Sequence, residues 1–152
     1  MSKLNNYKKY VTIQWRKVWP KGRKNQGRIL GNGPELADKL ESKLSKDILI
    51  RLVDTARLSI EEQISIMKKT DYFVGVHGAG LTLSIFLPSK SIVHEILSNM
   101  EGLRFMSIMS GHKTYTDYLY AKTKIINDNK ILFFNSDEFA NKILIHMREN
   151  NF

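Results

Sequence analysis

The sequence predicts an α/β fold built on a parallel sheet with helices on both of its faces. Strand-like and helix-like segments alternate along the chain, which is typical of βαβ units. Residues 71–76 are apolar at consecutive positions, as expected of a strand that is covered on both faces. The length of 152 residues suits one domain, because domains commonly have about 100–200 residues. We therefore expect one Rossmann-like domain over residues 1–152.

The strands are predicted from short runs of β-branched, aromatic and other apolar residues. The clearest runs lie at residues 11–15, 48–53, 71–76, 91–97 and 131–134. A further short strand is expected near 118–122, where the pattern is weak. The polar stretch from 16 to about 33 is expected to be a loop.

The helices are predicted from their apolar spacing and their end signals. Pro34 suits the first turn of a helix. Leucines then recur every fourth residue and give this helix an apolar face. Ser59 and Glu62 have the spacing of a capping box at the start of the next helix. Shorter helices are expected at 81–87 and 102–111, and a last helix is expected after Asn135 or Ser136.

Positive charge is concentrated at the start of the sequence. The chain has 24 Lys and Arg against 15 Asp and Glu, a formal net charge of +9. Residues 1–28 hold nine of the basic residues and no acidic residue, so the remainder is balanced. A local excess of this kind favours an anionic partner, which is a phosphorylated ligand, a nucleic acid or an anionic membrane.

Other features narrow the classes of function. Cysteine is absent, which excludes disulfides and a thiol nucleophile. No apolar run approaches the roughly 20 residues needed to cross a bilayer, so we expect a soluble segment without membrane contact. His94, His112 and His146 are scattered without metal-ligand spacing, and we therefore expect no metal site.

A glycine-rich turn follows the strand at 71–76. Gly75, Gly78 and Gly80 surround the strand end, and a helix is expected directly after them. Such a turn either connects strand and helix without a ligand or presents free amides to a phosphate. His77 is either a hydrogen-bonded structural residue or a donor to a phosphate or sugar oxygen. Glu95 closes an apolar strand, so it either pairs with a neighbour or accepts hydrogen bonds from a ligand hydroxyl such as a ribose.

Three segments together resemble glycosyltransferase family 61. They are Thr70–Thr82 with its histidine-glycine-alanine-glycine-leucine core, Phe86–Pro88 and Val93–Glu95. The resemblance implies the C-terminal, nucleotide-sugar-binding half of a GT-B enzyme, whose N-terminal acceptor domain lies outside this chain. It implies inverting, metal-independent transfer of a sugar from a UDP-sugar to a hydroxyl of a protein or polysaccharide, with no cofactor. It further implies the lumen of the endoplasmic reticulum or Golgi in a eukaryote, or the cytoplasm in a bacterium.

The resemblance also assigns roles to particular residues. Arg16 and Arg28 are expected to neutralise the diphosphate, and Glu95 is expected to hydrogen-bond the ribose. The diphosphate itself is expected on the backbone amides around Gly78, Ala79, Gly80 and Leu81, beside His77. Independently of the family, fixed amides and arginines stabilise the charge that develops on a UDP leaving group without a metal.

Two other interpretations stay open. The first is a basic nucleic-acid-binding module in which residues 1–28 contribute stacking aromatics. These aromatics are Tyr7, Tyr10, Trp15 and Trp19. The second is a non-catalytic member of the same family, because Trp15 and Leu83 differ from the residues usual at these positions.

Overall fold

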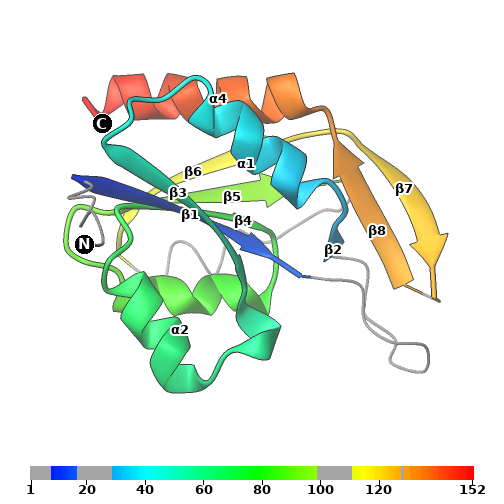
Figure 1. Cartoon of the computed structure of the whole chain (residues 1–152), viewed down its shortest axis with the longest axis horizontal. Coiled ribbons are helices and arrows are strands. Elements are labelled where there is room, and N and C mark those ends of the chain that lie inside the picture. Colours follow the sequence, from blue (N-terminus) through cyan, green and yellow to red (C-terminus); the bar gives the residue numbers. More distant parts are fainter. Residues whose placement is uncertain (1–7, 17–28, 99–110, 128) are drawn as a thin grey trace, which may run out of the picture.

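The computed structural model describes residues 8–16, 29–98, 111–127 and 129–152 (Figure 1). Arg28, and all but the last residue of the helix expected at 102–111, lie outside these ranges. The described elements form a central parallel sheet, helices on both of its faces and a small second sheet at one end.

The central sheet has five strands, all parallel. Side by side, they are β3 (Ile48–Asp54), β1 (Lys9–Trp15), β4 (Tyr72–Val76), β5 (Ile92–Leu97) and β6 (Lys113–Tyr118). Counted among themselves in chain order, they follow the doubly wound order 2-1-3-4-5. The predicted Rossmann-like α/β fold is confirmed, and the order of the strands reverses between β1 and β4.

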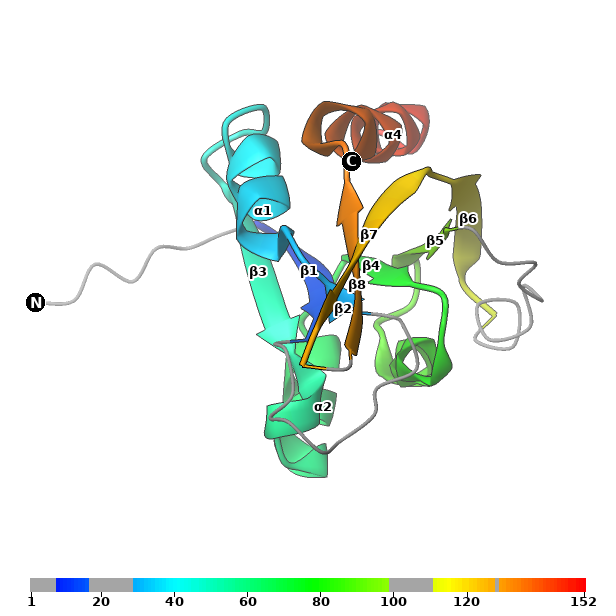
Figure 2. The ribbon, with the colours of Figure 1, turned by 90° about the vertical axis from the view of Figure 1, so that its right-hand side faces the viewer.

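Helices cover both faces of this sheet, as the two views show (Figure 1, Figure 2). α1 (Gly33–Glu41) and α4 (Ser136–Glu149) pack against each other on one face. α2 (Ile60–Met67) and the 3-10 helix η2 (Ala79–Phe86) pack together on the opposite face, and a short 3-10 turn, η1 (Thr55–Arg57), precedes α2.

The end signals read from the sequence act as predicted. The Ser59 hydroxyl accepts a hydrogen bond from the Glu62 amide at 3.2 Å, and the Glu62 carboxylate accepts one from the Ser59 amide at 2.7 Å. These two bonds satisfy backbone donors that the first turn of α2 leaves without a helical partner. Asn135 caps α4 in the same way, since its side-chain oxygen accepts a hydrogen bond from the Glu138 amide at 3.0 Å.

The helix expected at 81–87 differs in type and position. The structure has η2, a 3-10 helix that starts two residues earlier, with Gly78 as its N-cap. The turn is tightened from its first bond onward, because the Leu81 amide donates to the Gly78 carbonyl three residues back. Pro88 follows directly after the C-cap residue Leu87, as expected of a stop signal.

A second sheet was not predicted. It consists of β2 (Ile29–Leu30), β8 (Asn129–Phe134) and β7 (Ala121–Ile126), in that order. β7 and β8 form an antiparallel hairpin that projects from the carboxyl end of the central sheet (Figure 1). The strand expected at 118–122 is wrong, because this region holds the end of β6, a connection and the start of β7. The loop expected up to residue 33 likewise contains β2.

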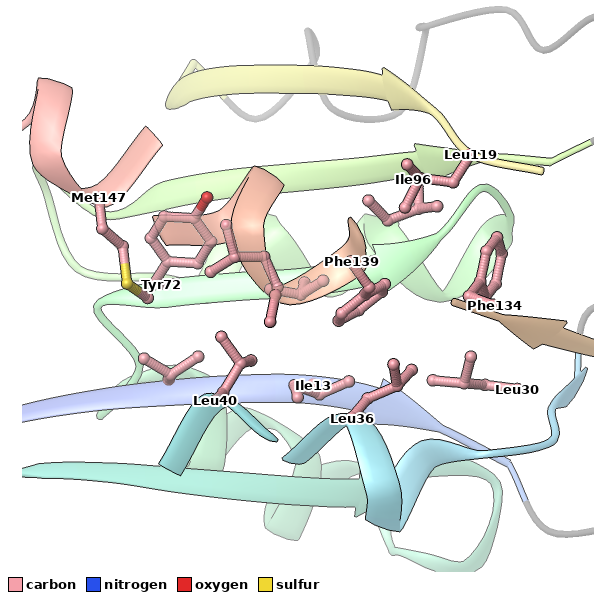
Figure 3. Close-up of a cluster of buried hydrophobic side chains, with 14 of the residues drawn as sticks. Ile13, Leu30, Leu36, Leu40, Tyr72, Ile96, Leu119, Phe134, Phe139 and Met147 are labelled. Carbon is pink, nitrogen blue, oxygen red and sulfur yellow. The ribbon is translucent and has the colours of Figure 1, made fainter. Parts of the chain in front are cut away.

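Alternation along the strands separates two apolar clusters, one under each helical layer. Tyr72 and Val74 face α1 and α4, whereas Phe73 between them faces α2 and η2. The larger cluster combines β1, β4 and β5 with both helices and β8 (Figure 3). Its labelled members are Ile13, Leu30, Leu36, Leu40, Tyr72, Ile96, Leu119, Phe134, Phe139 and Met147. Across the described residues, no helix combines the length and the apolar character that a membrane crossing requires.

Candidate functional site

The first candidate site lies where the order of the strands reverses. In open parallel sheets, ligands bind beyond the carboxyl ends of the strands at such a point. β1 and β4 are parallel neighbours, with Ile13 opposite Val74, so the residues that follow the two strands leave the same edge of the sheet. Arg16 follows β1, and the turn His77–Gly80 follows β4. The fold therefore brings two of the predicted groups to one edge.

The turn has three backbone amides without a hydrogen-bond acceptor among the described residues. The His77 amide donates to the Ile96 carbonyl at 2.8 Å, and the Leu81 amide donates to the Gly78 carbonyl at 3.0 Å. Between them, the amides of Gly78, Ala79 and Gly80 donate to no described residue. Ala79 is exposed and Gly80 is half-buried. Consecutive free donors at the start of a helical turn suit an anion.

Gln14 holds this turn in place, a role that the sequence did not reveal. A Cβ on Gly80 would lie 1.8 Å from the Gln14 side-chain nitrogen, and one on Gly75 would lie 3.1 Å from its side-chain oxygen. The Gln14 nitrogen also donates to the Thr55 hydroxyl at 3.1 Å. Gln14 thus connects the turn to the start of η1, directly after β3, and glycine is required at Gly80 for this close approach. The only signal in the sequence is an amide side chain near the end of an apolar strand.

His77 and Glu95 form a pair at the same edge. Glu95 lies on β5 opposite Gly75, and its side chain is 0% exposed. Its Oε1 accepts the hydrogen of His77 Nδ1, and the His77 side chain stays 19% exposed. The structure shows the pairing with a neighbour that the sequence left open for both residues, and contact of His77 with a phosphate or sugar oxygen stays a prediction. This pairing offsets the cost of burying the carboxylate. Contact of Glu95 with a ribose stays a prediction.

Leu81 does not contribute to the free face of the turn. Its amide is used within η2, and its side chain is fully buried among Met67, Phe73 and Val93. The expectation that its amide is available to a phosphate therefore needs correction, because the 3-10 geometry closes the turn one residue earlier. Leu83 is buried in the same cluster, so its apolar side chain has a packing role.

Arg16 borders an apolar pocket of about 360 Å³. Among the described residues, this pocket is lined by the end of β1 and by the small sheet, and by none of the residues from His77 to Leu81. The lining residues are Trp15, Arg16, Ile29, Leu30, Gly31, Ile126, Ile131 and Phe133. Arg16 thus joins the pocket to the edge on which the turn lies.

Two aromatic side chains of the nucleic-acid interpretation are engaged within the chain. The Trp15 indole nitrogen donates to the Leu30 carbonyl at 2.8 Å, and the ring lies against Gly33, where a Cβ would be 2.6 Å from it. The Arg51 guanidinium lies over the Tyr10 ring, with its Cζ atom 4.7 Å from the centre of the ring. These contacts explain both residues by packing. Tyr7 and Trp19 lie outside the described residues.

One group of described side chains has the composition of a metal site. His94, Asp117 and His146 each place a ligand atom within 4.8 Å of the other two. Burial lowers the pKa of His94, and the hydrogen bonds from His94 and His146 lower the pKa of Asp117. The sequence spacing predicted no such site, because the three residues come from β5, β6 and α4 and meet only in the fold.

Comparison with known proteins places the sequence of this chain in a family. The sequence profile described as glycosyltransferase 61 matches residues 2–94, which is more than half of the chain. The chain belongs to glycosyltransferase family 61. The matched part of this family 61 chain contains β1, Arg16 and the turn His77–Gly80, and it ends immediately before Glu95.

Several curated relatives are enzymes named EGF domain-specific O-linked N-acetylglucosamine transferase. The one from Xenopus laevis is 30% identical over 104 residues, which is 61% of this chain and 20% of the relative. The one from Drosophila melanogaster is 35% identical over 94 residues, which is 55% of this chain and 18% of the relative. The one from Gallus gallus is 26% identical over 99 residues, which is 58% of this chain and 18% of the relative. The chain thus spans about a fifth of the length of these relatives.

The contact between Gln14 and Gly80 leads to a stability prediction. We expect Gly80→Ala to lower the free energy of unfolding by about 1–2 kcal/mol, because the new methyl displaces the Gln14 amide from Thr55. The double variant Gln14→Ala/Gly80→Ala should lose less free energy of unfolding than the sum of the two single losses, because the clash between the two side chains has been removed. Urea denaturation of the four proteins measures both. Additive costs would show that Gln14 does not constrain this turn.

Proposed function

We propose that this chain binds the nucleotide-sugar donor of a glycosyltransferase, with the diphosphate of a UDP-sugar on the turn Gly78–Gly80. The observation that carries the proposal is the run of three amides without a described acceptor, at the reversal of the strand order. Membership of family 61 supports the reaction class. Together they favour phosphate binding over the alternative of a turn without a ligand.

The surrounding side chains suit the same ligand. Arg16 lies at the same edge of the sheet as the turn and supplies positive charge there. Glu95 occupies His77 Nδ1, so Nε2 is the ring nitrogen that is left to face a phosphate oxygen, and it donates to that oxygen only in the protonated ring. When the ring is protonated, both of its nitrogens donate at once. In this arrangement Glu95 acts on the donor through His77, as a positioning residue.

The proposed reaction is an inverting transfer. The bond between the sugar C1 and the β-phosphate oxygen breaks, and its electron pair stays on that oxygen. A hydroxyl oxygen of the acceptor bonds to C1 from the opposite face, and its proton passes to a base. Fixed amides with Arg16 stabilise the charge that develops on the leaving diphosphate, and this stabilisation needs no metal. We assign the base and the acceptor site to the rest of the full-length protein, opposite this domain in a GT-B arrangement.

The names of the relatives indicate the acceptor. They describe transfer of N-acetylglucosamine, O-linked, specific to EGF domains. We extend to this chain the reaction class, in which a sugar from a nucleotide donor is attached to a hydroxyl of a protein or glycan. Because the chain spans about a fifth of those relatives, acceptor recognition is assigned to the parts of the protein beyond this domain.

A proline at Ala79 tests the proposal by deleting one of the three amides. Ala79 is the first residue of η2 and follows an extended Gly78, a position at which proline fits a helical turn. We expect Ala79→Pro to keep the stability of the chain and to weaken UDP binding by about tenfold to a hundredfold, the scale of a lost hydrogen bond to a charged group. Calorimetry with EDTA present measures this affinity.

Ala79→Ser is the matched control, because it changes the same side chain and keeps the amide. It should bind UDP as the unmodified chain does. If a folded Ala79→Pro chain binds UDP with unchanged affinity, the turn is not the diphosphate site. If the unmodified chain binds no UDP, the proposal fails for this chain as a whole.

A second prediction separates the two roles of Glu95. If Glu95 acts through His77, Glu95→Gln and His77→Ala should each weaken UDP binding by roughly tenfold. The double variant should then bind UDP with the same affinity as His77→Ala alone. Binding of uridine, which lacks phosphates, should be unchanged in both. Direct contact of Glu95 with the ribose would instead appear as weaker uridine binding in Glu95→Gln and as additive losses for UDP.

A further inference from the structure

A group of polar side chains with no part in the proposed transfer lies under α4. It contains His94 from β5, Asp117 from β6 and His146 from α4. His94 Nε2 lies 2.8 Å and His146 Nε2 lies 2.7 Å from the same oxygen of Asp117, Oδ2. Two imidazole nitrogens therefore converge on one carboxylate oxygen, and the three residues belong to β5, β6 and α4, whose ribbons Figure 1 labels.

Each histidine is held through its second ring nitrogen. Tyr72 Oη lies 3.0 Å from His94 Nδ1, and Glu149 Oε2 lies 3.4 Å from His146 Nδ1. The His146 ring also stacks on Tyr115, with 3.9 Å between ring centres. Metal-binding histidines almost always donate their other nitrogen to a carboxylate, a carbonyl or another polar group, which fixes the ring and its tautomer. Both histidines here have such a partner, and both present Nε2 to the centre of the group.

The group is buried on one side and open on the other. The His94 side chain is 0% exposed, whereas those of Asp117 and His146 are 14% and 15% exposed. Lys142 Nζ lies 3.4 Å from Asp117 Oδ1, the oxygen that neither histidine contacts. Oδ2 is thus the oxygen available to an ion, and solvent reaches the group beside α4. A ligand set that is rigid, paired and partly open admits a cation with one coordination position left for water.

The group is separate from the turn that the proposed function uses. Successive residues of a strand point to opposite faces of the sheet. His94 therefore lies on the face covered by α4, and its neighbour Glu95 contacts His77 on the other. The family match ends at residue 94, so Asp117 and His146 lie beyond it. The site is independent of the proposed transfer.

We propose that His94, Asp117 and His146 bind one divalent transition-metal ion, with zinc as the best match. Two imidazole nitrogens, one carboxylate oxygen and a water complete the four-coordinate set that zinc adopts. Zinc–ligand distances of about 2.0–2.2 Å require Asp117 Oδ2 to move slightly away from the two Nε2 atoms, which it now contacts at hydrogen-bond distance. On binding, each ring carries its proton on Nδ1, where Tyr72 Oη and Glu149 accept it. The ion then links β5 and β6 to α4.

Zinc titration of the untagged chain tests this proposal. We expect one zinc ion per chain by calorimetry and a rise in the melting temperature with zinc concentration. His146→Gln and Asp117→Asn should each weaken binding by at least about 100-fold, since even residues that support a ligand typically contribute 10–100-fold. Glu149→Gln should weaken it by about tenfold, because it removes the charged partner of His146 Nδ1. Both ligand variants leave the buried His94 in place, which protects the fold.

His112→Gln is the matched control, because His112 lies outside the group. It should bind zinc as the unmodified chain does. Cobalt gives a second readout, since its visible absorption reports nitrogen and oxygen ligands and should disappear in His146→Gln. Two results would overturn the proposal, namely no saturable zinc binding by the unmodified chain, or equal zinc affinity in His146→Gln. Neither result depends on UDP binding, so the two proposals fail separately.

Discussion

The close approach of Gln14 to Gly80 is the contact on which the geometry of the turn depends. Because there is no room for a Cβ at Gly80, the backbone after β4 packs onto the Gln14 side chain of β1. The Gln14 side-chain nitrogen in turn donates to the Thr55 hydroxyl, directly after β3. The turn closes early, at the bond from the Leu81 amide to the Gly78 carbonyl. The amides of Gly78, Ala79 and Gly80 precede this bond and have no acceptor among the described residues, and of the three residues Ala79 is exposed, Gly80 is half-buried and Gly78 is buried. They lie at the reversal of the strand order, which is where open α/β sheets bind their ligands.

One strand, β5, contributes a residue to each of the two proposed sites. Alternation along β5 directs His94 toward α4 and Glu95 toward His77, so adjacent residues serve opposite faces of the sheet. Each of these buried polar side chains is satisfied by partners from neighbouring elements, as a close-packed interior requires. The apolar clusters on the two faces hold these partners in place, because they fix α4 on one side and η2 on the other.

Local signals in the sequence predicted much of the fold, and contacts between distant segments account for the rest. The Ser59–Glu62 box and the Asn135 cap are short-range patterns, and both formed as predicted. The strand expected at 118–122 was wrong because the buried Leu119 lies in the connection between two sheets and the buried Ala121 begins β7, whereas β6 is mostly half-buried and the rest of β7 is exposed. The glycine turn was visible in the sequence. Gln14 and the group around Asp117 were not, because each depends on neighbours that only the fold supplies.

Whether the backbone of the turn binds phosphate is tested most directly by the amide resonances of the turn itself. The measurement is a titration of nitrogen-15-labelled chain with UDP and, separately, with uridine, followed by proton–nitrogen correlation spectra. We expect UDP to move the Gly78, Ala79 and Gly80 amide signals most among the described residues and to saturate them together, whereas uridine leaves them nearly unchanged. Unchanged signals from these three amides at saturating UDP would show that the turn does not bind the diphosphate.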